Sequence, residues 1–355
     1  MTLENEARRI LDITEGFMKS QILFASLKLG IFDLLDTSAA PMTAARISEA
    51  IRADTDATKR LLDACAGLGL LQKVNVDKET GDGEYQLSKA SRAFLTSSSP
   101  TYLGQSVKGM ASSSYKPWGH LPRALKERPS FLISPTGLPQ KKSSTDPLRT
   151  IFVNKRVISM MAGITTVFGA RTASAFDLAE FQRICDIGGG SAPLAYHLAA
   201  AYPKASVSVF DLPVVVEVAE DERHAGEYSQ RVSFISGDFF KDPLPPADLY
   251  VVCRILHDWT EDKVLVLLTK MHDSLPQGGG LLIAEYMLDD DKTGPEVAHK
   301  YDLHMLLFTG GRERSGQEYK RLLTMVGFTE VTVRSNNYPF GHVLARKAPK
   351  YSAQL

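Results

Sequence analysis

The sequence predicts an α/β fold, with a parallel sheet in its second half and a mostly helical first half. Five short apolar runs in the second half each end in a glycine or polar cluster, and helix-like stretches separate them. Such runs, bounded by turn residues, are typical of buried parallel strands. They cover residues 184–190, 207–211, 232–239, 249–258 and 281–285. Because open parallel sheets bind ligands at the carboxyl ends of their strands, the polar clusters predict one lined site and an enzyme.

The first half predicts helices followed by a β-hairpin. An all-round apolar stretch indicates a buried helix or helix pair, and polar caps precede two further helices. A glycine-bearing turn then separates two strand-like arms. In order, these elements lie at 15–36, 44–50, 57–71 and 74–87. The order is a winged-helix pattern, which we assign to a domain at residues 1–100.

DNA binding is one use of a winged helix, but the sequence gives it little support. The helix expected at 57–71 has only Lys59 and Arg60 at its start and is otherwise apolar, which favours packing or dimerisation. The chain has 41 Lys plus Arg and 41 Asp plus Glu, so its formal net charge is zero. This balance argues against a general attraction to nucleic acid or to anionic membranes.

Targeting signals and cysteine pairs are not evident either. The N-terminus lacks the basic-then-apolar layout of a secretory signal, and no apolar stretch approaches the ~18 residues of a membrane helix. Cys65, Cys185 and Cys253 are far apart and form no disulfide framework or metal motif. We expect a cytoplasmic protein.

Residues 101–170 predict a connector with a helix from 151 to 168. Met161 in this helix can line a ligand pocket, because methionine adapts to flat aromatic shapes, although core packing is the commoner role at helical spacing. Phe152 and Phe168 are further candidates for contact with a substrate.

A glycine loop follows the first strand and precedes a helical run. Gly188 and Gly190 allow a tight turn and close approach to a ligand, and the helix start offers free N–H groups. The loop does not match the dinucleotide pattern, because Pro193 occupies the place of the third glycine. It fits the looser acidic-x-G-x-G-x-small pattern of S-adenosylmethionine sites.

The next two strand ends strengthen this interpretation. Asp211, with Leu212 beside it, ends a strand and can accept hydrogen bonds from ribose hydroxyls. Gly237 and Asp238 end the following strand, where Asp238 can meet an adenine amine and Phe239 can stack on the ring. We therefore predict S-adenosyl-L-methionine as methyl donor in a domain at residues 171–355.

His257 follows the fourth strand and is a candidate general base. Glu285, at the next strand end, and Glu313 can orient its imidazole and stabilise the imidazolium. A phenol of pKa ~10 and a histidine of ~6.5 differ by ~3.5 units, or ~5 kcal/mol, and nearby carboxylates shrink that gap. Proton removal thus needs no metal, and we expect none.

Motifs spread along the chain indicate a specific family. They lie at 16–24, 30–35, 114–121, 237–245 and, above all, 254–259. Through them the chain resembles the small-molecule O-methyltransferases of the caffeate and hydroxyindole type. This resemblance implies a seven-stranded, Rossmann-like methyltransferase sheet. It also implies a homodimer through the N-terminal domain, whose partner protomer helps to close the pocket for a small aromatic hydroxyl substrate.

The same resemblance implies roles for single residues. His257 matches the family's base, and Glu285 and Glu313 match its flanking carboxylates. Asp258 matches a substrate contact. The positions that match cofactor contacts are Gly188, Asp211, Asp238, Phe239 and Arg254.

The chain departs from the family pattern at two positions that are expected to contact the methyl acceptor. His304 and Phe308 stand where members that methylate N-acetylserotonin carry Asn and Gln. Phe308 would leave polar groups of that hydroxyindole less well matched, and such mismatches cost selectivity. The acceptor is therefore either an N-acetylserotonin-like hydroxyindole or another phenol, including polyketide phenols.

Four other functions remain as alternatives. They are a nicotinamide-dependent oxidoreductase on the same sheet, a DNA-binding regulator, a binding protein without activity and a metal-dependent catechol methyltransferase. The missing third glycine argues against the first, and the intact His257, Glu285 and Glu313 argue against the third.

Overall fold

The computed structural model describes residues 2–127, 132–133, 139–140, 155–221, 228–335 and 338–348. The chain divides into two compact units, Met1–Ser112 and Ser113–Leu355. The three-part division expected from the sequence, with a connector at 101–170, stays a prediction.

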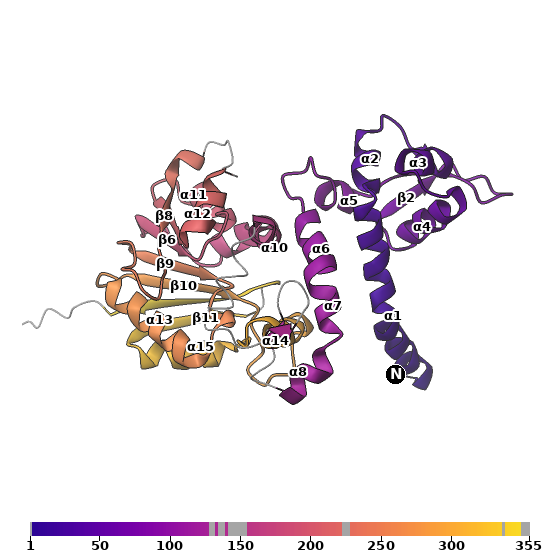
Figure 1. The fold of residues 1–355 in the computed structure, drawn as a ribbon. Coiled ribbons are helices and arrows are strands. Elements are labelled where there is room, and N and C mark those ends of the chain that lie inside the picture. Colours follow the sequence, from indigo (N-terminus) through magenta and orange to yellow (C-terminus); the bar gives the residue numbers. More distant parts are fainter. Residues whose placement is uncertain are drawn as a thin grey trace, which may run out of the picture. The chain divides into compact units, whose positions relative to one another are not determined.

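The N-terminal unit has the predicted winged-helix order of helices and a small antiparallel sheet (Figure 1). Its helices are α1 (Leu3–Lys28), α2 (Ile31–Thr37), α3 (Ala44–Ile51), α4 (Thr55–Gly67), α5 (Lys89–Phe94) and α6 (Gly104–Gly109). Its strands, in sheet order, are β1 (Met42–Thr43), β3 (Glu84–Leu87) and β2 (Leu71–Val74).

Local sequence explains where these helices begin and end. The Thr43 and Asp54 side chains cap α3 and α4 by accepting hydrogen bonds from backbone N–H groups. The apolar stretch at 15–36 is a helix pair, because Gly30 takes a left-handed φ of 74° between α1 and α2. Buried side chains from α2, α3, α4 and β3 then form one core, which includes Ile31, Ile47, Leu62 and Tyr85.

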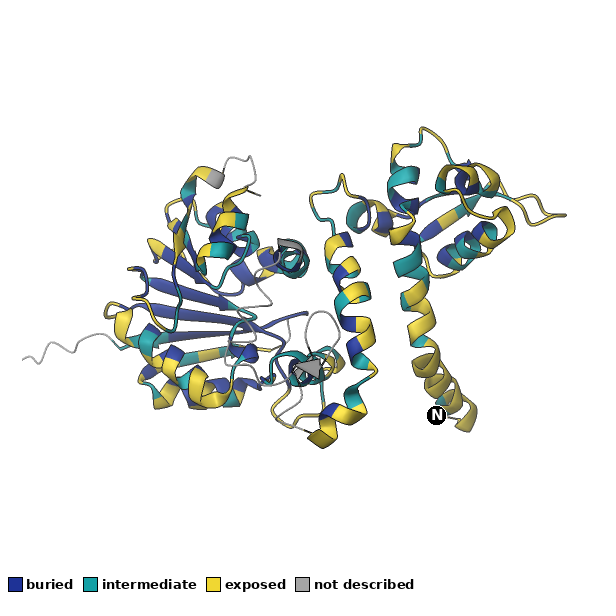
Figure 2. Cartoon of the chain, viewed as in Figure 1, coloured by how far each residue is buried: buried dark blue, intermediate teal, exposed yellow. Residues whose placement is uncertain are grey.

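Helix α1 begins earlier than the apolar pattern predicts, and its first turns are exposed (Figure 2). Large apolar side chains lie on these turns and remain exposed in the single chain. They are Leu3, Ile10, Leu11, Ile13, Phe17 and Met18.

The C-terminal unit is built on a seven-stranded sheet with the order β11-β12-β10-β9-β6-β7-β8. Strands β10, β9, β6, β7 and β8 pair in parallel, and β12 pairs antiparallel with β10 and β11. The five parallel strands are β6 (Arg183–Ile187), β7 (Ser206–Asp211), β8 (Val232–Ser236), β9 (Leu249–Cys253) and β10 (Gly280–Glu285). They confirm the fold class predicted from the apolar runs. The other two strands are β11 (Phe328–Arg334) and β12 (Gly341–Lys347).

Helices cover both faces of this sheet (Figure 1). Alternate strand residues pack against α13 (Glu261–Ser274) and α15 (Gly316–Met325) on one face. The intervening residues pack against α11 (Pro193–Ala201) and the end of α10 (Lys155–Ala173) on the other. The sheet is thus buried on both faces, which leaves its strand ends as the natural place for a site.

The remaining elements of this unit are shorter or lie at its edge. They are a π-helical turn (Met110–Ser114) that leads into it, α7 (Tyr115–Trp118), α8 (Leu121–Glu127), β4 (Leu132–Ile133), β5 (Pro139–Gln140), α12 (Pro213–Asp221), two 3₁₀ turns (Ser229–Arg231 and Leu256–Asp258) and α14 (Glu296–Phe308). Across the described ranges, no helix combines the length and the apolar character needed to span a membrane.

Candidate active site

The carboxyl ends of the parallel strands line a cavity in the C-terminal unit. The loops after β6, β7, β8 and β9 all contribute to its wall, as the strand order predicts. The sequence-predicted residues that line it are Met161, Gly188, Gly190, Asp211, Leu212, Asp238, Phe239, Arg254 and Asp258.

The glycine loop is shaped by close contacts with its neighbours. Gly188 has a φ of 72°, and a Cβ atom there would lie 2.5 Å from Ile255 Cδ1. A Cβ atom on Gly189 would lie 2.6 Å from Asp186 Oδ2. Gly190, with a φ of 58°, donates its N–H to Asp211 Oδ2 at 2.9 Å. Side chains are therefore excluded from two positions in the loop, and its backbone forms part of the cavity wall.

Two acidic side chains lie side by side at this loop. Asp211 Oδ1 accepts a second hydrogen bond from the Leu212 N–H at 2.7 Å, whereas the buried Asp186 carboxylate has no partner among the described residues. Burial, together with the charge of Asp211, raises the pKa of Asp186 to about 7. Burial also raises the pKa of Asp211 to about 6, against the effect of its two N–H donors. Such a wall favours a cationic ligand that also carries hydroxyl groups.

An aromatic cluster forms another part of the wall. The ring of Phe240 lies 4.7 Å from that of Trp259, edge to face, and 4.9 Å from that of Phe239. The Lys263 ammonium lies 4.4 Å from the Trp259 ring centroid. All three aromatic residues line the cavity and suit a flat heterocycle. Of these three, only Phe239 was predicted from the sequence as a site residue, although Trp259 lies within the family motif at 254–259.

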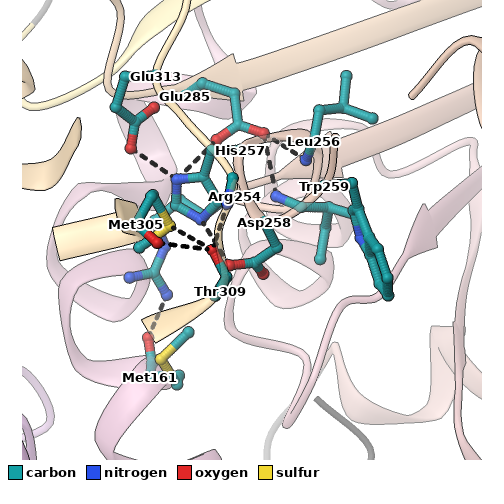
Figure 3. Close-up of polar contacts among 12 residues, drawn as sticks. Met161, Arg254, Leu256, His257, Asp258, Trp259, Glu285, Met305, Thr309 and Glu313 are labelled. Atoms are coloured by element: carbon teal, nitrogen blue, oxygen red, sulfur yellow. Dashed lines mark hydrogen bonds and ion pairs between the residues drawn. The ribbon is translucent and has the colours of Figure 1, made fainter. Parts of the chain in front are cut away.

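His257 lies in the 3₁₀ turn that follows β9, with carboxylates on both sides (Figure 3). Its Nδ1 is 2.7 Å from Glu313 Oε1 and 3.5 Å from Glu285 Oε2. Its Nε2 has no hydrogen-bond partner among the described residues and lies 3.8 Å from Asp258 Oδ1. Nδ1–H thus donates to Glu313, so in the neutral ring the lone pair that can act as a base lies on Nε2.

Glu285 is fixed by the backbone of the same turn. Its Oε1 accepts hydrogen bonds from the N–H groups of Ile255 at 3.0 Å and Leu256 at 2.8 Å. Glu285 and Glu313 are fully buried, and His257 is 3% exposed. The imidazole is therefore held rigidly in a place that water barely reaches.

The charges in this cluster set the proton affinity of the imidazole. Burial alone would lower the pKa of His257, but the carboxylates of Glu313, Glu285 and Asp258 outweigh it and raise this pKa to about 10. Burial raises the pKa of Glu285 to about 7, although the charge of His257 acts in the opposite direction. The cluster binds a proton tightly, which matches it to phenols of pKa ~10.

The same three side chains are also the described group best placed for a metal ion. His257, Glu285 and Glu313 offer ligand atoms within 4.8 Å of one another. The Nδ1–H to Glu313 bond and the backbone donors to Glu285 already engage three of these side-chain atoms. The expected absence of a metal stays a prediction.

Arg254 lines the cavity and contacts α10, which forms the neighbouring part of the wall. It takes a left-handed φ of 56°, and its guanidinium donates to the Met161 carbonyl (Figure 3). Its Nε has no partner among the described residues. A positive, partly unpaired group at this wall suits a carboxylate.

The predicted acceptor residues on α14 form a second aromatic cluster. Trp118 Nε1–H donates to His304 Nδ1 at 3.3 Å, and the Phe308 ring lies 4.3 Å from the His304 ring. Burial, and to a lesser degree the charge of His257, lowers the pKa of His304 to about 4. His304 is therefore neutral, and its proton lies on Nε2. Neither His304 nor Phe308 lines the cavity at the strand ends.

Phe168 and Gly237 do not line this cavity either, and the buried His257, Glu285 and Glu313 lie behind its wall rather than in it. Phe152 lies outside the described residues. Phe168 packs edge-to-face on Tyr338, at 5.8 Å between ring centroids, and against the cluster that contains Tyr286. Gly237 allows close packing, because a Cβ atom there would lie 2.5 Å from the Phe210 ring.

Comparison with known proteins places the chain in a family. Residues 142–329 match the model of an O-methyltransferase domain, and residues 11–97 match that of an O-methyltransferase dimerisation domain. Human acetylserotonin O-methyltransferase is 36% identical over 345 residues, which is 97% of this chain and 99% of the relative. The chicken (Gallus gallus) acetylserotonin O-methyltransferase is 35% identical over 341 residues, 95% of this chain and 96% of its own.

Comparison with solved structures gives the same result as comparison of sequences. The crystal structure of human N-acetylserotonin methyltransferase in complex with SAM has a TM-score of 0.88 and 35% identity, and it covers 98% of this chain and 99% of its own. The mitomycin 7-O-methyltransferase MmcR, at 22% identity and a TM-score of 0.77, supports the fold alone; 97% of this chain and 98% of that one are covered.

The fold and the site define a small-molecule methyltransferase. The chain belongs to the O-methyltransferase family with an N-terminal dimerisation domain, and it is an S-adenosylmethionine-dependent O-methyltransferase. The predicted fold, family and reaction class are confirmed. This reaction class replaces two of the alternatives, the nicotinamide-dependent oxidoreductase and the DNA-binding regulator.

Proposed function

We propose that this protein is a homodimer that transfers the methyl group of S-adenosylmethionine to a hydroxyl of a small aromatic substrate, with His257 as general base. One observation carries the proposal. His257 Nδ1 is tied to Glu313 at 2.7 Å, while its buried Nε2 is unpaired among the described residues and lies beside Asp258 of the cavity wall.

The cavity at the strand ends is the proposed donor site. Bound S-adenosylmethionine supplies a methyl group made electrophilic by the positive sulfonium. Asp211 is placed to accept hydrogen bonds from ribose hydroxyls, and Asp238 and Phe239 to meet the adenine. Arg254 can pair with the donor's carboxylate, and the glycine loop lets the backbone approach.

His257 then acts on the acceptor. Its Nε2 takes the hydroxyl proton as the oxygen forms its bond to the methyl carbon and the carbon–sulfur bond breaks. The proton stays on the imidazole, where Glu313 and Glu285 stabilise the positive charge. Fixed orientation in a nearly dry site lowers the barrier further, because the reacting groups need no reorganisation.

His304 and Phe308 bear on the choice of acceptor. Since Trp118 donates to Nδ1 of His304, the Nε2–H of His304 is a hydrogen-bond donor. Together with the Phe308 ring, it presents a more aromatic surface than an amide pair would. These residues favour a phenol whose second oxygen accepts a hydrogen bond, including polyketide phenols. A hydroxyindole such as N-acetylserotonin is the other candidate.

The homodimer is supported by the N-terminal unit. The first turns of α1 carry exposed apolar side chains such as Ile10 and Phe17, which a second copy of the chain can bury. The match to a dimerisation domain supports the same assembly. A cytoplasmic location stays a prediction.

A methyl-transfer assay with labelled S-adenosylmethionine tests the proposed function. The panel contains N-acetylserotonin, simple catechols, hydroxycinnamates and a polyketide phenol, each with and without a chelator. We expect turnover on at least one phenol, unaffected by the chelator. Loss of turnover with the chelator would contradict the metal-free mechanism. Turnover only on N-acetylserotonin would contradict the preference assigned to His304 and Phe308.

A further inference from the structure

We propose that Arg314 is a positioning residue that holds the His257 turn in its reactive place. This inference rests on the proposed role of His257 as base. Arg314 follows Glu313 directly, but its side chain is 1% exposed, which is unusual for an arginine. It does not touch the cavity.

The guanidinium of Arg314 joins both ends of the turn. Its Nη1 donates to the Leu256 carbonyl and its Nη2 to the Trp259 carbonyl, each at 3.0 Å. Nη1 also donates to the Arg312 carbonyl at 3.3 Å, which ties the guanidinium to its own segment. One rigid planar group thus fixes the residues that flank His257 and Asp258.

The hydrogen bonds of the Arg314 Nη atoms go to backbone carbonyls, and the hydroxyl of the buried Tyr319 lies next to the same guanidinium. In the part of the chain that the structure describes, no carboxylate oxygen lies within the 4.0 Å ion-pair distance of its guanidinium. Burying a cation costs free energy that hydrogen bonds must offset, and here those bonds go to the carbonyls around His257. The buried guanidinium of Arg314 therefore serves to hold this turn.

The residues that precede Arg314 in the sequence contact the same turn. The Arg312 N–H donates to the His257 carbonyl at 2.9 Å. A Cβ atom on Gly311 would lie only 1.9 Å from that carbonyl oxygen, so the two backbones are in close contact. Glu313 binds the imidazole and is itself held by Asp302, which accepts its N–H at 2.8 Å. Residues 311–314 thus fix both the backbone and the ring of His257.

The position of His257 Nε2 affects the rate, because Nε2 must lie within reach of the acceptor's hydroxyl proton while the methyl group is transferred. A displacement of about 1 Å at a reacting group can cost ~10²-fold in rate. Without Arg314, the Leu256 carbonyl keeps only its 3.3 Å bond from the Trp259 N–H, and the half-buried Trp259 carbonyl loses the guanidinium. The turn can then shift, while the donor-site residues outside it, such as Asp211 and Asp238, stay in place. The rate should therefore fall more than donor binding does.

The test compares Arg314→Met and Arg314→Lys with a matched control, Arg321→Met, on the full-length protein. Arg321 of α15 is half exposed, and its guanidinium contacts Glu261 at the start of α13 and Met325 instead of the carbonyls of the His257 turn. Calorimetric titration with S-adenosylmethionine gives the number of donor-binding sites and their affinity. The acceptor turned over fastest by the wild type then gives kcat per donor-binding site.

We expect Arg314→Met to lose ~10²-fold in kcat per site and to weaken donor binding much less than that, because only part of the donor cavity belongs to the turn. Arg314→Lys should lose less, because an ammonium can still reach one of the two carbonyls. Arg321→Met should keep the wild-type kcat. A kcat per site within about twofold of the wild type for Arg314→Met would overturn the proposal, even if fewer sites were active, since that result indicates a purely structural role.

Two further variants keep the test decisive. If Arg314→Met does not fold, Gly311→Ala adds one methyl group against the His257 carbonyl, and an unchanged kcat per site would likewise overturn the proposal. His257→Ala separates this inference from the proposed function. Substantial turnover by His257→Ala would refute the base assignment itself, whatever the Arg314 variants do.

Discussion

Glu313 Oε1 lies 2.7 Å from His257 Nδ1, and both side chains are buried. This contact fixes the tautomer, because Nδ1 must carry the proton that it donates to a carboxylate. In the neutral ring the basic lone pair then lies on Nε2, next to Asp258 of the cavity wall. The pair thus defines both which nitrogen can act as a base and where it acts.

The substitution Glu313→Gln should disable this arrangement. The amide that replaces the carboxylate can present its NH₂ group to Nδ1, which favours the opposite tautomer and no longer stabilises an imidazolium. We expect kcat to fall by ~10²-fold or more, with donor affinity unchanged. Steady-state kinetics and calorimetric titration measure the two quantities. Glu296→Gln, at an exposed ion pair with Lys300, is the control and should keep the wild-type kcat. Equal kcat values for both variants would contradict the assigned role of Glu313.

The raised pKa of His257 predicts opposite pH dependences for activity and stability. In the free protein this pKa is about 10, against 6.5 for an ordinary histidine, so the base form becomes more abundant as pH rises from 7 to 10. Turnover should increase over this range. The stabilisation from the protonated ring is fully present below pH 6.5 and is lost as pH rises through about 10.

Rate profiles and thermal unfolding from pH 6 to 10 check these trends. The melting temperature should fall where turnover rises, and His257→Gln should lack most of this fall. A wild-type rate that is flat from pH 7 upwards would show that the resting imidazole is already neutral.

Donor binding should release a proton. The pKa of the buried Asp186 is about 7 in the free protein, because of burial and the charge of Asp211. A bound cation favours the ionised carboxylate, so binding below pH 7 should expel the proton and affinity should weaken as pH falls. Titration at pH 6 in two buffers of different ionisation enthalpy measures the release. Asp186→Asn should remove most of the release, and the remainder would come from Asp211, whose pKa is about 6. A binding enthalpy independent of buffer in the wild type would rule the release out.

Acceptor preference should follow the residues on α14. The double variant His304→Asn with Phe308→Gln restores the amide pair of the hydroxyindole members. We expect its kcat/KM ratio for N-acetylserotonin over other phenols to rise by ~10-fold or more, since matching a buried polar group is worth that much. Donor affinity should not change, because neither residue lines the donor cavity. An unchanged ratio would remove both positions from substrate choice.

Much of the fold could be read from the sequence because its parallel strands are buried on both faces. Strand β9, for example, is a continuous apolar run, and Asp211 marks the end of β7 in the chain as in the structure. Strand β11 did not give such a signal. It pairs only with β12 at the edge of the sheet, and its exposed polar residues interrupt the apolar pattern.

Some residues of the site could be predicted from the sequence and others could not, because a local pattern does not show contacts with distant parts of the chain. Glu285 and Glu313 could be predicted as partners of His257 from strand order and family motif together. Arg314 could not, because a charged residue in a glycine-rich segment is normally exposed, and its backbone partners are 55 and 58 residues away in the sequence. Phe168 shows a different limit. The sequence suggests it as a candidate for contact with a substrate, and in the structure its ring packs against Tyr338.

The central claim is that His257 is the general base, and single-turnover methyl transfer by His257→Ala tests it most directly. The variant is first saturated with labelled S-adenosylmethionine, and its donor affinity is measured by calorimetry. The proposed mechanism predicts a transfer rate lower by ~10²- to 10⁴-fold, with donor affinity unchanged. A transfer rate within about tenfold of the wild type at full donor occupancy would contradict it, and the proton would then have to leave by another route.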